Sequence, residues 1–321
     1  MRARPQLCTL RAAAVDAGNS FAVAPCLVFP SSHVTTSSLH LAAPAARHRI
    51  HNVAAAGFEN QAAMYEKTRP SYPFNSVEYV IELIRAQKLQ GTSSPVLDLA
   101  AGGGKFTRLL ARHPWLEVSA VEPVAAMRSV FKEMMPMIPC LEGTGDAIPF
   151  GDKHFDAVTV AQAFHWMSTL ESLREIHRVL RPKGTLVLIW NMESRSAPWM
   201  GQLRDVYEQY DTHIPQYRHG EWKKVFALPE AQRLFPGPLT TRFFQQEMIV
   251  TKGMAWERVL SKSYIASLTR SEQALVRSRV DRVVEEHIAA FDLSVEDPVT
   301  GKIDRAARQP IDTEVTFIRA A

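Results

Sequence analysis

An acidic residue followed by small residues forms the most chemically informative stretch of the chain, residues 98–104 with the sequence DLAAGGG. Asp98 ends a short apolar run, and an amphipathic pattern follows the glycines. Glycine lets a backbone approach a ligand closely. A carboxylate beside such a loop would repel a pyrophosphate but could accept hydrogen bonds from a cationic ligand. The stretch therefore predicts a strand–loop–helix unit that binds a small molecule.

Two well-known nucleotide loops fit this stretch poorly. A P-loop needs a glycine five residues before its Gly-Lys-Ser/Thr, but Leu99 stands there and Phe106 follows Lys105. The dinucleotide pattern Gly-x-Gly-x-x-Gly has Thr107 in place of its third glycine. A nicotinamide-dependent oxidoreductase stays an alternative, and the missing glycine counts against it.

Further carboxylates follow the expected strands. Glu122 ends the second strand, 18 residues after Gly104, where an acid can accept both hydroxyls of a ribose. Asp146 stands in a turn between Gly145 and Ala147. A turn-forming aspartate is the alternative interpretation there.

These residues resemble the class I S-adenosylmethionine-dependent methyltransferases. The first motif of that family is an acid with small residues two, four and six positions later. Asp98, Ala100, Gly102 and Gly104 match it, with Ala100 in place of the usual first glycine. Residues 65–73 and 161–166 are similar to the trans-aconitate methyltransferase-like, methyltransferase type 11 branch, which carries Tyr…Arg-Pro-x-Tyr-Pro and Phe-His-Trp motifs.

The resemblance implies S-adenosyl-L-methionine as cofactor and no metal. It implies that Asp98 organises the amino-acid end and that Glu122 binds the ribose. It also implies that Asp146 and the Ala147 N–H bind the adenine. The expected cofactor-binding set is Asp98, Ala100, Gly102, Gly104, Glu122, Asp146, Ala147, Gln162 and Phe164.

On the acceptor side, the resemblance places Tyr65, Arg69 and Trp166 toward a small-molecule substrate. His165 could act as a general base for a hydroxyl substrate, or be a buried histidine that satisfies loop backbone. A carboxylate needs no base but favours a cationic anchor, for which Arg69, Arg195, Arg218 and His219 are candidates. Carboxyl O-methylation is the first expectation and hydroxyl O-methylation the second. A non-catalytic S-adenosylmethionine-binding regulatory protein is a further alternative.

The order of elements predicts an α/β fold. Strands alternating with helices imply a mainly parallel sheet covered on both faces. The resemblance implies a Rossmann-like sheet of seven strands, the last antiparallel, in a domain over residues 58–321. Residues 191–240 form the expected lid and substrate-selecting insertion. Strands are expected at 96–99, 117–122, 155–160, 185–190, 241–250 and 314–318, an extended piece at 141–150, helices at 76–87, 106–113, 125–134, 170–180 and 254–291, and irregular structure at 192–235. The helical region 254–291 is expected to break near Leu268, and a capping box at residues 269–272 restarts the helix.

Residues 1–57 differ from the rest in composition. Their arginines, against Asp16 alone, account for the net charge of +4, which disfavours a nucleic-acid-binding face on the remainder. An acid-poor, arginine-bearing extension is typical of an organellar transit peptide, and a disordered extension without a targeting role is the alternative. We expect a mitochondrial or plastid location in the first case and a cytoplasmic one in the second. No apolar stretch approaches the roughly 18 residues of a membrane span.

Overall fold

The computed structural model describes residues 67–86, 93–211, 214–288, 293–296 and 301–321, all within a compact unit from His40 to Ala321. The expected extension over residues 1–57 lies outside the described residues, as does Tyr65. No helix in the described ranges is long and apolar enough to cross a membrane.

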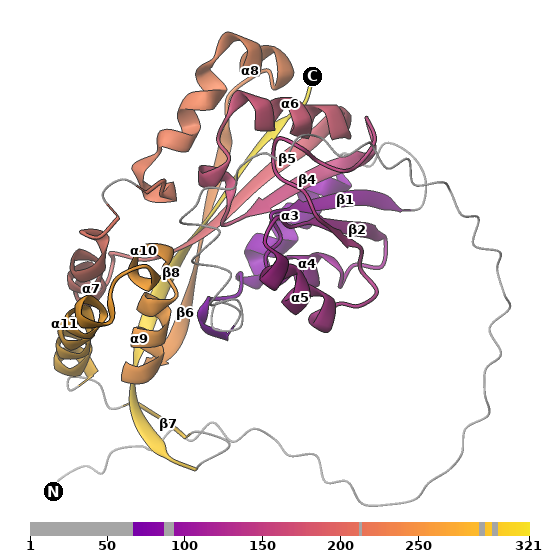
Figure 1. Cartoon of the computed structure of the whole chain (residues 1–321). Coiled ribbons are helices and arrows are strands. Elements are labelled where there is room, and N and C mark those ends of the chain that lie inside the picture. The colour runs from indigo at the N-terminus through magenta and orange to yellow at the C-terminus, as the bar shows by residue number, and fades with distance from the viewer. Residues whose placement is uncertain (1–66, 87–92, 212–213, 289–292, 297–300) are drawn as a thin grey trace, which may run out of the picture. The chain divides into compact units, whose positions relative to one another are not determined.

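A central sheet organises this unit (Figure 1). Its strands follow the order β3-β2-β1-β4-β5-β8-β6, and the short β7 pairs with β8. β8 runs antiparallel to both of its neighbours, whereas β1 to β5 are parallel. Along that path the sheet has the expected seven strands, and β7 is an addition. The strands are β1 (Ser94–Leu99), β2 (Leu116–Val121), β3 (Cys140–Leu141), β4 (Phe155–Ala161), β5 (Leu180–Glu193), β6 (Thr240–Thr251), β7 (Ser294–Glu296) and β8 (Ile303–Arg319).

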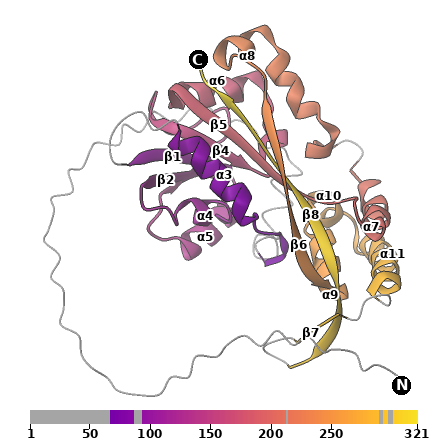
Figure 2. The same ribbon diagram turned by 180° about the vertical axis from the view of Figure 1, so that it is seen from behind.

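Helices cover both faces of the sheet, as Figures 1 and 2 show from opposite sides. Successive strand residues point to opposite faces. Val96 therefore packs with α3 (Phe74–Arg85) and α4 (Thr107–Leu110), while Leu97 packs with α6 (Leu170–Val179) and α8 (Pro229–Leu234). α5 (Ala125–Met134) packs Phe131 against Ala120 of β2. This layering brings the carboxyl ends of β1, β2 and β4 to one edge.

A second hydrophobic core lies beside the end of β6 and the start of β8, where these two strands pair. It is formed by α7 (Pro198–Glu208), α9 (Lys252–Leu260), α10 (Ser263–Ala266) and α11 (Arg270–Ile288). Val250 and Ala307 are the buried strand residues of this core, and Met248 of β6 packs against it. α11 starts with the predicted capping box, in which the Glu272 N–H donates to Thr269 Oγ1 and the Thr269 N–H donates to Glu272 Oε2.

Several expected elements have different bounds. The helix expected at 106–113 is helical only over Thr107–Leu110, and the helical region 254–291 has a second break at Ser261–Lys262. The final strand, Ile303–Arg319, is much longer than the expected 314–318. Its buried positions before Glu314 include the polar residues Gln309 and Thr313, so apolar alternation does not mark this part of the strand in the sequence.

The region 192–235 is not irregular. It contains α7, α8 and the 3-10 helices η2 (Tyr217–His219) and η3 (Glu221–Ala227). Trp199, Leu203 and Tyr207 recur every four residues along α7 and form its buried face. Trp222 and Phe226 pack in the core beside the sheet. Many aromatic residues of the expected insertion therefore belong to the hydrophobic core.

Candidate functional site

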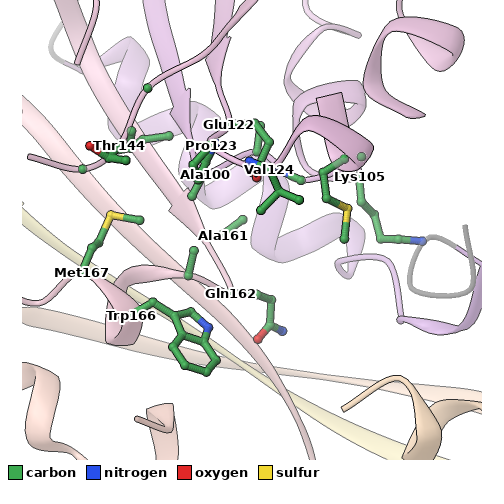
Figure 3. Close-up of a pocket in the computed structure, with 18 of the residues that line it drawn as sticks. Ala100, Lys105, Glu122, Pro123, Val124, Thr144, Ala161, Gln162, Trp166 and Met167 are labelled. Carbon is green, nitrogen blue, oxygen red and sulfur yellow. Dashed lines mark hydrogen bonds between the residues drawn. The ribbon is translucent and has the colours of Figure 1, made fainter. Parts of the chain in front are cut away.

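A cavity of about 220 Å³ opens at the carboxyl ends of β1, β2 and β4. Ligands of open α/β sheets bind at this edge. Ala100 and Gly102 from the loop after β1, Glu122 after β2, and Gln162 and Trp166 after β4 all line it. Figure 3 shows Ala100, Glu122 and Val124 together, with Gln162 and Trp166 contributed by the β4 side. We call this the cofactor pocket.

Every second residue from position 100 to position 104 in the glycine loop has a left-handed backbone conformation. The φ angles are +58° at Ala100, +59° at Gly102 and +86° at Gly104. A Cβ atom at Gly102 would meet nothing within 4 Å, whereas one at Gly104 would lie 1.9 Å from Met135 Cε. Gly102 therefore faces the cofactor pocket, and Gly104 permits the loop to pack on α5. Gly104 does not line the pocket.

Asp98 lies behind the loop and outside the pocket lining. Its side chain is fully buried, and it accepts hydrogen bonds from Thr107 Oγ1 at 2.6 Å and Thr159 Oγ1 at 3.0 Å. Burial raises the pKa of Asp98 to about 6, although these hydrogen bonds lower it. Asp98 thus fixes the start of α4 relative to β4 from beneath the loop.

Glu122 lies at the pocket wall and is 4% exposed. Its Oε2 accepts the Gly102 N–H and its Oε1 accepts the Val124 N–H, both at 2.8 Å. Burial raises the pKa of Glu122 to about 7, against the lowering effect of these hydrogen bonds. Each carboxylate oxygen keeps a second lone pair for a ligand hydroxyl.

The turn after β3 carries Asp146. This residue lines the pocket, and its Oδ1 accepts a hydrogen bond from Thr144 Oγ1 at 2.6 Å. Ala147 does not line the pocket, and its N–H donates to the Thr144 carbonyl at 3.2 Å. The expected Ala147 donor is therefore engaged within the turn.

The loop after β4 divides its residues between pocket and core. Gln162 and Trp166 line the pocket, and Gln162 has a φ of +60°. Its amide donates to the Asn191 carbonyl at 3.0 Å. Phe164 has no exposed area and packs against Trp222 and Phe226, so it does not line the pocket.

His165 lines a second cavity. The Trp190 indole N–H donates to His165 Nδ1 at 3.3 Å. Burial lowers the pKa of His165 to about 3, with further lowering by the charges of Arg69 and His219. A neutral imidazole with Nδ1 already accepting carries its proton on Nε2. This arrangement makes His165 a poor general base.

The second cavity, of about 70 Å³, shares Arg69, Gln162 and Trp166 with the cofactor pocket. We call it the acceptor cavity. Arg69 donates to the Ser261 carbonyl at 2.9 Å. Arg218 lines this cavity and pairs with Asp211, whereas Arg195 and His219 are not among its lining residues.

Sequence reasoning missed several residues around these cavities. Val124, which follows the Glu122-Pro123 pair, lines the cofactor pocket. An apolar residue just after the strand that ends in the ribose-binding candidate was a usable signal for this, because ligand pockets are mostly apolar. Other missed pocket residues are Lys105, Met127, Thr144 and Met167. Within the described ranges no cluster of three or more His, Cys, Asp or Glu side chains could hold a metal ion.

Comparison with known proteins is consistent with this architecture. A methyltransferase domain family matches residues 97–188. An uncharacterized methyltransferase of Schizosaccharomyces pombe is 37% identical over 233 residues, which cover 71% of this chain and 87% of that protein. A demethylmenaquinone methyltransferase of Thermotoga maritima is 34% identical over 130 residues, covering 40% of this chain and 55% of that protein. Another Schizosaccharomyces pombe protein, described as methyltransferase-like, is matched over 64% of its length.

The fold has a counterpart among solved structures. A protein of Anaeromyxobacter dehalogenans, described as a type II methyltransferase, superposes with a TM-score of 0.54 at 17% identity. The match covers 79% of this chain and 97% of that one. This match shows the fold alone. The family match and the sequence relatives lead to one assignment: the chain belongs to the class I S-adenosylmethionine-dependent methyltransferases, in the type 11 branch.

Proposed function

We propose that this protein methylates a carboxylate of a small-molecule acid. The observation that carries the proposal is the pair of adjoining cavities, which meet at Arg69, Gln162 and Trp166. One has the features of a cofactor site, and the other is lined by cationic side chains. An acceptor held in the second cavity would present its reactive oxygen at the mouth of the first.

The cofactor pocket fits S-adenosylmethionine, the cofactor of the family. A buried carboxylate, Glu122, can accept two ligand hydroxyls, and Val124 and Met127 supply apolar surface for a flat base. When bound, S-adenosylmethionine supplies a methyl group attached to a positively charged sulfur. A carboxylate oxygen is already ionised, so it can accept this methyl group without a base to remove a proton from it.

The residues at the junction have positioning roles. Arg69 would hold the acceptor carboxylate by charge, and Trp166 would close the site against water. Positioning and exclusion of water can supply much of the acceleration of such a reaction. The low pKa of His165 also favours an acceptor that needs no base. The matched demethylmenaquinone methyltransferase is named for a small-molecule acceptor, which supports a small-molecule substrate here.

The test uses the full-length chain and methyl-labelled S-adenosylmethionine. The acceptors are monocarboxylic acids, dicarboxylic acids and phenols. Methyl esters release the label as volatile methanol in alkali, whereas methyl ethers keep it. We expect alkali-labile label from carboxylic acids and none with Glu122→Ala. Label found only in alkali-stable products would overturn carboxyl methylation, and tight cofactor binding without any transfer would favour the regulatory alternative.

A further inference from the structure

We infer that Asn191 of β5 is a positioning residue for methyl transfer. Its side-chain amide holds residues 67–73, which we call the strap, and its backbone carbonyl holds Gln162. Arg69 and Gln162 are two of the three residues that line both cavities, and Asn191 places one through the strap and the other directly. The inference rests on the cofactor of the family and not on the class of the acceptor.

The strap forms part of the wall of both cavities. Arg69, Pro70 and Tyr72 line the cofactor pocket, and Arg69 also lines the acceptor cavity. Residues 69–73 belong to no helix or strand. Backbone carbonyls outside regular structure take their hydrogen bonds from side chains or water. The position of the strap therefore depends on the side chains that reach its carbonyls.

Asn191 reaches the strap from the interior of the sheet. It is 4% exposed and lines the acceptor cavity. Its Nδ2 donates to the Ser71 carbonyl at 3.1 Å and to the Pro70 carbonyl at 3.5 Å. Gln246 of β6 donates to the same Ser71 carbonyl at 2.7 Å. Two amides thus hold the strap, and the one from Asn191 is on the side of the cavities.

The neighbours of Asn191 fix the direction in which its amide faces. A backbone carbonyl can only accept a hydrogen bond, so Nδ2 must face the strap. Oδ1 accepts from Thr313 Oγ1 of β8 at 2.6 Å, and Thr313 is fully buried. An aspartate here would have the same shape but would present an oxygen to the carbonyls of Pro70 and Ser71. The strap therefore requires the donor of the amide, and the shape of the side chain alone does not suffice.

The backbone of Asn191 holds the opposite wall of the junction between the cavities. Its carbonyl accepts from Gln162 Nε2 at 3.0 Å, and the Gln162 N–H donates to the Ile189 carbonyl at 2.8 Å. Gln162 has a φ of +60°, which is sterically costly for a residue with a Cβ atom. These two hydrogen bonds to β5 hold the loop after β4 in that conformation. One residue of β5 thus sets the separation of the strap from this loop.

Calorimetry with S-adenosylhomocysteine on the full-length protein at pH 8 tests the inference. Asn191→Leu removes the donor, and we expect the affinity to fall about fivefold or more. Asn191→Asp keeps the shape and the hydrogen bond from Thr313, yet we expect a fall of about tenfold or more, because its oxygen faces two carbonyls. A role in packing alone would leave the aspartate variant close to the natural protein.

Hydrogen exchange at saturating S-adenosylhomocysteine gives a local measurement. In the natural protein the ligand should slow the exchange of amides in both the strap and the glycine loop, since both line its pocket. In Asn191→Leu the glycine loop should still be protected, whereas the strap should lose this protection. Loss of protection in both segments, or in neither, would contradict the inference.

Thr313→Val is the matched control in the same buried cluster. It removes the hydrogen bond to Oδ1 and should lower the melting temperature, but Nδ2 still faces the strap. Its S-adenosylhomocysteine affinity should stay within about twofold of the natural value, with the strap still protected. The inference is overturned if Thr313→Val and Asn191→Leu weaken binding equally, or if Asn191→Asp binds as the natural protein does. These measurements need no acceptor, so failure of the label assay would reject carboxyl methylation and leave this inference standing.

Discussion

The Glu122 carboxylate accepts the backbone N–H of Gly102 at 2.8 Å, so the acid after β2 holds the glycine loop after β1 in place. The residue expected to bind the ribose therefore also shapes the loop beside it. The ionisation of Glu122 should therefore affect both ligand binding and the conformation of the glycine loop.

Cofactor affinity should depend on pH through Glu122. Its pKa is raised to about 7 by burial, and only the ionised form can accept two ligand hydroxyls together with two backbone N–H groups. Binding should therefore weaken as pH falls through 7, by about tenfold between pH 8 and pH 6. Calorimetry with S-adenosylhomocysteine measures this, and Glu122→Gln should bind weakly at both values. Asp98, with a pKa of about 6, should add a smaller dependence at lower pH.

Gly102 and Gly104 have different roles in the loop, and mutation should separate them. At Gly104→Ala the new Cβ would lie 1.9 Å from Met135 Cε, at the end of a flexible side chain that can move, and 2.9 Å from Phe131 Cδ2. With the left-handed backbone of this position, we expect a loss of about 2–4 kcal/mol in unfolding free energy. Gly102→Ala meets no atom within 4 Å and should lose only about 1 kcal/mol for its left-handed backbone. Its methyl group would enter the cofactor pocket, so S-adenosylhomocysteine affinity should fall. Equal melting temperatures would contradict this division.

Ala100→Gly should not destabilise the protein. Relief of the strain at a φ of +58° is worth about 1–2 kcal/mol, and the greater freedom of glycine in the unfolded chain offsets about 0.5–1 kcal/mol. We expect the free energy of unfolding, measured with denaturant, to rise by about 0–1.5 kcal/mol. Ala101→Gly, next in the chain and without a positive φ, is the matched control and should lose about 0.5–1 kcal/mol.

Thr107→Val should lower stability, because it removes the hydroxyl that donates to the buried Asp98 carboxylate at 2.6 Å. We expect a loss of about 1–3 kcal/mol at pH 8 and a smaller loss at pH 5. The folded-state pKa of Asp98 is raised to about 6, so the carboxyl is protonated and less costly to leave unpaired at the lower pH. Thr185→Val is the control: this buried hydroxyl has no partner among the described residues, and its removal should be neutral or stabilising. A penalty independent of pH would show that Thr107 acts by packing alone.

His165 should stay neutral across the physiological range. Imidazole nitrogen NMR on the full-length protein should show a proton on Nε2 from pH 5 to 8, because burial lowers the pKa of His165 to about 3. His165→Gln serves to assign the signal. A midpoint near 6.5 would contradict the arrangement and restore His165 as a candidate base.

Local sequence signals predicted the elements that build the cofactor pocket. β1, β2, β4 and α5 lie within a few residues of their expected bounds, because apolar runs and helical periodicity are properties of neighbouring residues. The capping box at Thr269 is equally local, and it was confirmed.

Contacts between distant segments were not predictable in this way. Lys262 reaches Glu193 across 69 positions in the chain, and neither residue belongs to a recognisable motif. Phe164 lies within the motif that drew attention to it, yet packing against Trp222 and Phe226 buries it in the core. Sequence spacing fixes which loop a residue occupies, but the side of the loop on which it packs depends on the whole fold.

The central position of β8 has a consequence for how the protein is made. β8 pairs with β5 on one side and β6 on the other, although β6 precedes it in the chain by more than fifty residues. During synthesis, β6 therefore has no strand to join until residues 303–319 have left the ribosome. Until then its edge is open to other chains, and a cell that makes this protein has reason to shield it with a chaperone.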